Sequence, residues 1–273
     1  MREGTTILTL DNGYHLWTHT DNVGGKIRLL CLHGGPGGNY ENFAEKLKDI
    51  DVQVTMYDQL GSWYSDQPDF TKQENVDKFL KMDYFVDEIE EVRQKLGIDD
   101  FYLIGQSWGG AITQEYALKY PKHLKGIIIS SMTDNIAEYI VNINKIREHE
   151  YSKEDLDFMK ECENSGDYDN ERYQKLIDKL NCGYVDRKQP PAISHLTSTV
   201  ATSVYNYFQG DNEFVITGAL DGWDIRNKIK NISVPTLITY GEHETMPLET
   251  GRRMAATIPH ARFATTPNGG HHH

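Results

Sequence analysis

The sequence predicts an α/β fold with a mostly parallel central sheet, helices on both faces and an inserted all-helical cap. Three observations lead to this prediction. Short apolar runs alternate with helical patterns between residues 26 and 131. Residues 133–211 are rich in charge, have helical periodicity and contain no convincing strand, and the strand pattern then returns in residues 234–267. Alternating strands and helices are typical of a parallel sheet that is covered on both sides.

Each predicted strand follows from a local pattern. Residues 5–10 and 14–20 flank Asp11-Asn12-Gly13, a turn sequence that accepts positive φ, and predict an antiparallel hairpin at the sheet edge. The later strands are short runs with few charges, as expected of strands that are buried on both faces. They are expected at residues 26–33, 52–58, 100–107, 124–131, 234–244 and 261–267.

Helices are predicted where apolar residues recur three and four positions apart. In residues 77–97 this stripe ends at Gly97, a residue typical of helix C-termini. The other helices are expected at residues 40–50, 108–121, 135–149, 153–164, 168–181 and 248–258. We therefore expect a discontinuous core formed by residues 1–132 and 212–273, with residues 133–211 as a helical cap of small-domain length.

Composition narrows the class of protein. The 273 residues are 38% hydrophobic and 25% charged, which is ordinary for a globular protein, and the net charge of −13 disfavours nucleic acid as a partner. We find no apolar run near the ~20 residues of a membrane span and no signal peptide pattern, so a cytoplasmic protein without a membrane partner is expected. The three cysteines form no disulfide framework or C-x-x-C pair, so we expect no metal site.

The stretch Gly105-Gln106-Ser107-Trp108-Gly109 fits the pattern G-x-S-x-G at the predicted junction of a strand and a helix. A sharp turn there would make the Ser107 hydroxyl protrude, and the glycines would allow the two elements to pack closely. The N-terminus of the following helix supplies N–H groups and positive partial charge where an oxyanion would form. The pattern therefore predicts that Ser107 is a nucleophile.

A second glycine motif, LHGGPGGNY at residues 32–40, directly follows another predicted strand. Glycine lets such a loop approach the nucleophile closely and point a backbone N–H at the same position. We therefore expect the N–H groups of Gly35 and Trp108 to form the oxyanion hole.

The catalytic acid and base are expected late in the chain, in the order serine, acid, histidine. The stretch YGEHETMP at residues 240–247 ends one strand and contains Glu244, and TPNGGHHH at residues 266–273 ends the next and contains His271. His271 Nε2 would take the proton of Ser107, and Glu244 would hold the Nδ1 proton. Other candidate imidazoles are those of His33, His243 and His260.

Together these motifs resemble the proline iminopeptidase (prolyl aminopeptidase) family of α/β hydrolases and its L-amino-acid amidase relatives. The resemblance runs from about residue 26 to the end of the chain. It rests on HGGPGG, YDQLGSWYSDQPD (57–69), GQSWGG, GDNEFVITGALDGWDI (210–225) and VPTLITYGEHETMP (234–247). It implies an α/β-hydrolase fold, cofactor-free removal of an N-terminal residue, often proline, from short peptides, or hydrolysis of amino-acid amides.

The resemblance also implies how the substrate amine is read. It gives the glutamate of NEF, Glu213, the role of pairing with the substrate ammonium, which would reject N-blocked peptides. The chain departs from the family at two neighbouring positions: Glu244 stands where the acid is usually Asp, and Thr245 stands where relatives often carry a second acidic residue. The second departure favours a looser amidase.

Three functions follow from these residues. The first is a serine aminopeptidase or amidase that releases proline or a small apolar residue through an acyl-enzyme, with a small peptide or amino-acid amide bearing a free amine as its substrate. The second is a carboxylesterase on the same scaffold, which the charged insertion disfavours. The third is a catalytically silent binding protein, which would usually have lost the serine or the histidine.

Overall fold

One sheet organises the molecule, for which a computed structural model describes residues 2–187 and 195–273. The strands are β1 (Gly4–Thr9), β2 (His15–Asp21), β3 (Arg28–Leu32), β4 (Gln53–Tyr57), β5 (Phe101–Gln106), β6 (Leu124–Ser130), β7 (Thr236–Gly241) and β8 (Ala261–Thr266). Within the described residues these eight strands form one sheet in the order β1-β2-β4-β3-β5-β6-β7-β8. β2 pairs antiparallel with β1 and β4, and every later pair is parallel. The predicted mostly parallel sheet with an N-terminal hairpin is confirmed.

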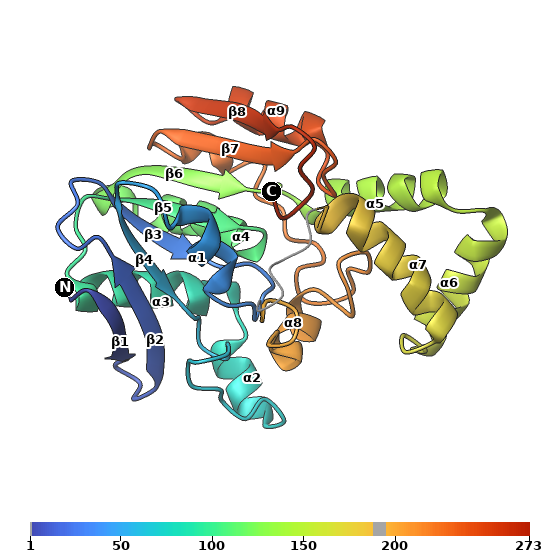
Figure 1. Ribbon diagram of the computed structural model, residues 1–273, viewed down its shortest axis with the longest axis horizontal. Helices are drawn as coiled ribbons and strands as arrows, with labels where there is room; N and C mark the ends of the chain where they lie inside the picture. The colour runs from blue at the N-terminus through green and yellow to red at the C-terminus, as the bar shows by residue number, and fades with distance from the viewer. Residues whose placement is uncertain (1, 188–194) are drawn as a thin grey trace.

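The helices cover both faces of this sheet (Figure 1). They are α1 (Glu41–Leu47), α2 (Gln73–Phe79), α3 (Met82–Leu96), α4 (Trp108–Lys119), α5 (Ile136–Glu150), α6 (Lys153–Ser165), α7 (Glu171–Leu180), α8 (Thr202–Phe208) and α9 (Leu248–Thr257). Alternate residues of β3 divide between two apolar clusters: Cys31 packs on the side of α1, and Leu32 packs with α3 and α4. This alternation explains why β3 reads as a continuous apolar run, because both of its faces are buried.

The prediction of one helix over residues 77–97 is wrong. The chain forms α2 and α3, separated at Leu80, whose φ of −83° and ψ of 65° are not helical. Both Phe79 and Leu80 are buried at this break, so the apolar residues continue through it and conceal it in the sequence. The predicted end at Gly97 is confirmed, since Gly97 adopts the left-handed conformation with φ of 62°.

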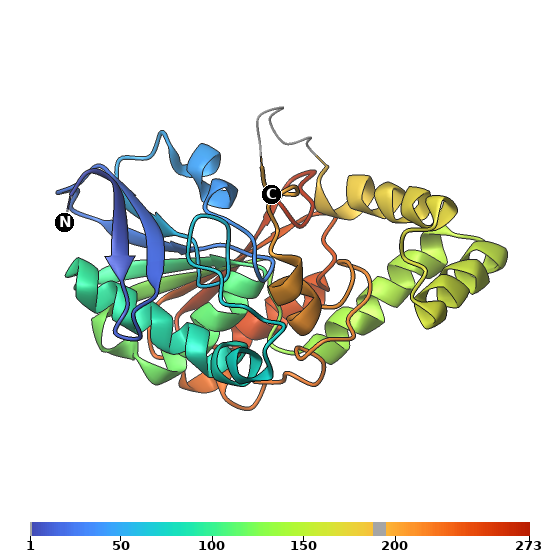
Figure 2. The ribbon, with the colours of Figure 1, turned by 90° about the horizontal axis from the view of Figure 1, so that it is seen from below.

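The segment between β6 and β7 is helical, as the sequence predicts. It contains α5 to α8 and a π-helical turn, η2 (Asn181–Val185), while residues 188–194 of the predicted cap lie outside the described residues. Figures 1 and 2 show α5, α6 and α7 extending beyond the end of the sheet that is opposite the β1-β2 hairpin. The C-terminus lies where these helices meet the sheet. The division of the chain into a core and a cap at residues 132/133 and 211/212 remains a prediction.

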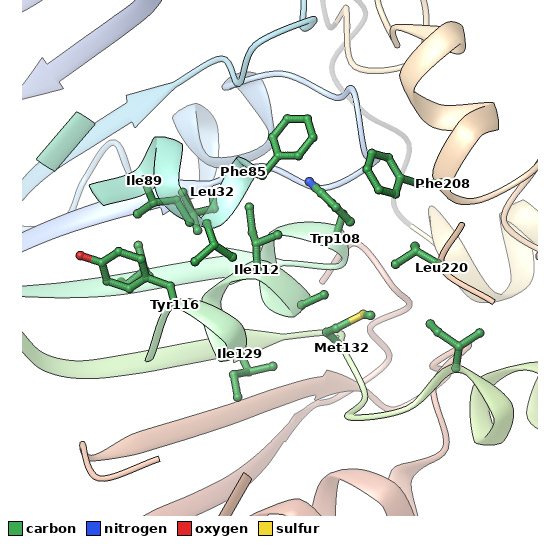
Figure 3. Close-up of a cluster of buried hydrophobic side chains, with 14 of the residues drawn as sticks. Leu32, Phe85, Ile89, Trp108, Ile112, Tyr116, Ile129, Met132, Phe208 and Leu220 are labelled. Atoms are coloured by element: carbon green, nitrogen blue, oxygen red, sulfur yellow. The ribbon is translucent and has the colours of Figure 1, made fainter. Parts of the chain in front are cut away.

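Figure 3 shows aromatic side chains packed around Trp108, the residue after Ser107. The Trp108 ring lies 4.6 Å from the ring of Phe208 on α8 and 5.4 Å from that of Phe85 on α3. The indole Nε1 of Trp108 also donates a hydrogen bond to Gln59 Oε1 at 2.9 Å. These contacts anchor the start of α4 to three other segments. Within the described residues, no helix is long and apolar enough to cross a membrane.

Candidate active site

Ser107 lies at the sharp turn between β5 and α4. Its φ of 54° and ψ of −123° are unusual for a residue with a side chain, and strain of this kind gathers at functional sites. The turn is possible because neighbouring residues lack side chains: a Cβ on Gly105 would overlap the carbonyl group of Gly109, and a Cβ on Gly109 would overlap the carbonyl oxygen of Leu32. Ser107 keeps 8% of its surface exposed, so its environment is nearly closed.

The start of α4 and the glycine loop after β3 both lie at this serine. Helix α4 begins at Trp108, whose N–H is in the first turn, where helical amides have no acceptor within the helix. The glycine loop after β3 lies against the turn, since a Cβ on Gly34 would be 3.1 Å from Ser107 Cβ. Gly35, the next residue, has a φ of 109°, which glycine adopts at little cost. The two glycine motifs of the sequence therefore meet at Ser107.

Glu244 and His271 form a buried pair at the carboxyl ends of β7 and β8. Glu244 Oε1 lies 2.8 Å from His271 Nδ1, and the two residues are 6% and 1% exposed. The carboxylate also accepts hydrogen bonds from Ser131 Oγ at 2.6 Å and from the backbone N–H of Thr245 at 2.9 Å. These donors hold the longer side chain of Glu at the position where an Asp is usual in the family that the motifs resemble.

The charges of this pair stabilise each other. Burial raises the pKa of Glu244, but the His271 imidazole and the hydrogen bonds outweigh burial and lower that pKa to about 2. Burial lowers the pKa of His271, but the carboxylates of Glu213 and Glu244 outweigh it and raise that pKa to about 9. Both shifts favour the charged forms of the pair, a carboxylate and an imidazolium.

The other nitrogen of His271 faces Glu213. His271 Nε2 lies 3.6 Å from Glu213 Oε1, and this buried nitrogen has no hydrogen-bond partner among the described residues. Glu213 lies after α8, with its side chain 14% exposed. The buried hydroxyl of Tyr139 on α5 donates a hydrogen bond to the Glu213 carboxylate. The same hydroxyl lies 2.8 Å from the backbone carbonyl oxygen of Glu213.

Hydrogen bonds fix the backbone of His271 beside the serine turn. Gln106, the residue before Ser107, donates from Nε2 to the His271 carbonyl oxygen at 3.2 Å. On the other side, the N–H of His271 donates to the carbonyl oxygen of Tyr184 in η2 at 2.8 Å. The structure thus brings the Glu244–His271 pair, Glu213 and the Ser107 turn into one neighbourhood. The hydrogen bond between Ser107 and His271 Nε2 is not formed.

Proteins of known type resemble this chain in sequence over most of their length. A sequence-family profile described as the alpha/beta hydrolase fold matches residues 27–147. The proline iminopeptidase of Flavobacterium johnsoniae is 32% identical over 268 residues, which cover 94% of this chain and 88% of that protein. The chain belongs to the proline iminopeptidase family. The proline iminopeptidase of Elizabethkingia meningoseptica is 33% identical over 275 residues, covering 97% of this chain and 90% of that protein.

Solved structures agree on the fold. The crystal structure of proline iminopeptidase from Mycobacterium smegmatis has a TM-score of 0.85 and 23% identity, and it covers 98% of this chain and 92% of that one. The crystal structure of VinJ has a TM-score of 0.89 and 24% identity, with coverage of 98% and 92%. The protein is therefore a hydrolase of the α/β-hydrolase fold, as the sequence motifs predict.

Two polar residues that support the site of this proline iminopeptidase relative, Ser131 and Tyr139, were missed in the sequence. Ser131, with a φ of 49°, follows β6 and holds Glu244, while Tyr139 holds Glu213 from a helix 74 residues earlier in the chain. The position of Ser131 at the carboxyl end of a strand next to β7 is a signal that could have found it. No local pattern distinguishes Tyr139, because it belongs to the buried face of α5 together with the apolar residues of that helix.

The competing histidine His33 has a different role. It is buried after β3, and its Nε2 accepts a hydrogen bond from the N–H of Gln59 at 3.0 Å. Its proton is therefore on Nδ1, which donates to the Gly34 carbonyl oxygen at 2.9 Å. Burial lowers the pKa of His33 to about 4, with the Gly34 hydrogen bond opposing it. His33 thus braces two loops and has no free nitrogen with which to act as a base.

Proposed function

We propose that the protein is a serine aminopeptidase or amino-acid amidase. It releases proline, or another small or apolar N-terminal residue, from short peptides, or it hydrolyses amino-acid amides. The proline iminopeptidases among its relatives support the substrate class. The observation that carries the proposal is the position of Glu213, whose carboxylate lies 3.6 Å from His271 Nε2.

The chemistry follows from the roles of three side chains. The Ser107 hydroxyl attacks the substrate carbonyl carbon while His271 Nε2 takes its proton, and Glu244 keeps the ring oriented through Nδ1. The N–H groups of Gly35 and Trp108 stabilise the negative oxygen of the tetrahedral intermediate. His271 then protonates the departing amine, which leaves an acyl-enzyme, and a water molecule activated by His271 hydrolyses this ester. No cofactor enters these steps.

Glu213 decides which substrates use this machinery. An N-terminal residue whose carbonyl is attacked by Ser107 has its amine only two bonds away from that carbonyl carbon. A carboxylate beside His271 is therefore within reach of the ammonium group and gives it a charge-assisted hydrogen bond. A neutral ester has no such group, so the carboxylate would lose its partner on binding, and this favours a peptidase or amidase over a simple carboxylesterase.

The test compares free with blocked amines. We expect the purified protein to hydrolyse prolyl and alanyl p-nitroanilides much faster than the N-acetylated forms, and equal rates would show that Glu213 does not read the amine. Ser107→Ala is expected to lower kcat by about 10⁶-fold. It should also abolish labelling by a fluorophosphonate probe. Activity retained by this variant would remove Ser107 from the mechanism.

A further inference from the structure

We propose that Glu213 also keeps His271 protonated until a substrate ammonium arrives, so that the substrate itself switches the catalytic base on. This inference rests on the proposed function, because it needs Ser107 as the nucleophile and Glu213 as the amine site. It goes further, because the Glu213 carboxylate then has two partners one after the other, first the imidazole of His271 and then the substrate ammonium.

The geometry around His271 leads to this conclusion. The ring lies between two carboxylates, with Glu244 2.8 Å from Nδ1 and Glu213 3.6 Å from Nε2. A neutral ring with its proton on Nδ1 would turn the Nε2 lone pair toward a carboxylate, with no donor there among the described residues. An imidazolium instead presents an N–H to each carboxylate. Before a substrate binds, this arrangement therefore favours the form of His271 that cannot accept the Ser107 proton.

Other titratable groups near the His271 ring, from several elements, also affect the equilibrium between its neutral and protonated forms. Asp186, after η2, adds to the effect of the two glutamates on the pKa of His271, which is about 9. A pKa raised in this direction keeps most of the imidazole protonated near neutral pH. Further titratable neighbours of His271, Glu213 and Asp186 include Lys46, Tyr139, Tyr205, His272 and His273.

Substrate binding removes the preference of His271 for the imidazolium form. When the substrate ammonium pairs with Glu213, the carboxylate no longer offers an unshared negative charge to Nε2, and the Nε2 proton leaves to solvent. The neutral ring can then take the Ser107 proton as the Ser107 oxygen bonds to the carbonyl carbon. One proton is released on binding, and one is transferred from Ser107 to His271 during attack. A blocked amine fails twice, because it neither pairs with Glu213 nor frees the base.

The decisive variant is Glu213→Gln, compared with Asp211→Asn. Asp211 is a half-buried carboxylate two residues away that is not among the largest influences on the pKa of His271. We measure kcat/KM from about pH 6 to pH 10 for a neutral ester, p-nitrophenyl acetate, and for proline p-nitroanilide. For the wild type, kcat/KM on the ester is expected to rise through an apparent pKa near 9, the value in the free protein.

Glu213→Gln is expected to lower that apparent pKa by at least about one unit, which raises ester hydrolysis at pH 7 by about tenfold or more. The same variant should lose activity on proline p-nitroanilide, and Asp211→Asn should change neither profile. Superimposable ester profiles of wild type and Glu213→Gln, with the anilide activity lost, would overturn the switch and leave the proposed function standing. Unchanged anilide activity in Glu213→Gln would instead overturn the amine site itself.

A second measurement needs neither the ester nor a substitution at Glu213. Ser107→Ala binds prolinamide without hydrolysing it, and calorimetry in two buffers of different ionisation enthalpy counts the protons released. We expect close to one proton per bound prolinamide near pH 7.5. Binding without proton release would show that His271 does not lose its proton and would refute the switch.

Discussion

Replacing one buried carboxyl group near the site by an amide should raise the free energy of unfolding of the protein. Glu88 on α3 is 3% exposed, and its two carboxylate oxygens lie 3.2 and 3.4 Å from the N–H of Leu60. Leu60 follows Gln59, which accepts the hydrogen bond of the Trp108 indole. Glu88 therefore supports the serine turn indirectly. Burial raises the pKa of Glu88 from 4.5 to about 8, against the opposing effect of the Leu60 hydrogen bond.

The sign and size of the effect follow from that pKa. An acid whose pKa is raised by folding holds its proton in the folded state after the unfolded chain has lost it. Its stabilising contribution is complete below pH 4.5 and is lost as the pH rises toward 8. Each pH unit in this window costs about 1.4 kcal/mol. Glu88→Gln keeps an acceptor for the Leu60 N–H and does not ionise, so it avoids this loss.

The assay is urea unfolding of wild type and Glu88→Gln at about pH 5.5 and about pH 7.5. The gain in unfolding free energy of the variant should be larger at the higher pH by about 3 kcal/mol. Glu74→Gln, at an exposed position of α2, is the control, and its effect should stay within about 0.5 kcal/mol at both pH values. A difference between wild type and Glu88→Gln that does not change with pH would refute the reasoning.

Two further substitutions test the contacts of the site. Tyr139→Phe removes the hydrogen bond that holds the Glu213 carboxylate, and the loss of about 1.5–3 kcal/mol should lower kcat/KM for proline p-nitroanilide by about 10- to 100-fold. Hydrolysis of p-nitrophenyl acetate should fall much less, and an equal fall on both substrates would contradict a specific role for Tyr139. Gly109→Ala places a Cβ against the Leu32 carbonyl oxygen and should destabilise the fold by about 1–3 kcal/mol in urea unfolding. An unchanged unfolding midpoint would show that α4 can move away from β3.

Much of the fold could be predicted because its causes are local. A strand that is buried on both faces is mostly apolar, and the central residues of β3, β5 and β6 show this in the sequence. The turn at Ser107 also leaves a local signal, because its close approach to β3 excludes a side chain at Gly109. The break at Leu80 left no such signal, since the apolar pattern of α2 runs on into α3.

The sequence by itself determined the alternation of strands and helices, the glycine turn that contains Ser107, and the order in which Glu244 and His271 follow it. Each of these depends on backbone conformation or burial, which restricts the residues allowed at fixed spacings. Only the tertiary structure decided that Glu213 lies beside His271, that Tyr139 holds Glu213, and that Ser131 supports Glu244. These pairs join residues far apart in the chain, and a side-chain contact across such a distance imposes no pattern on the residues around either partner.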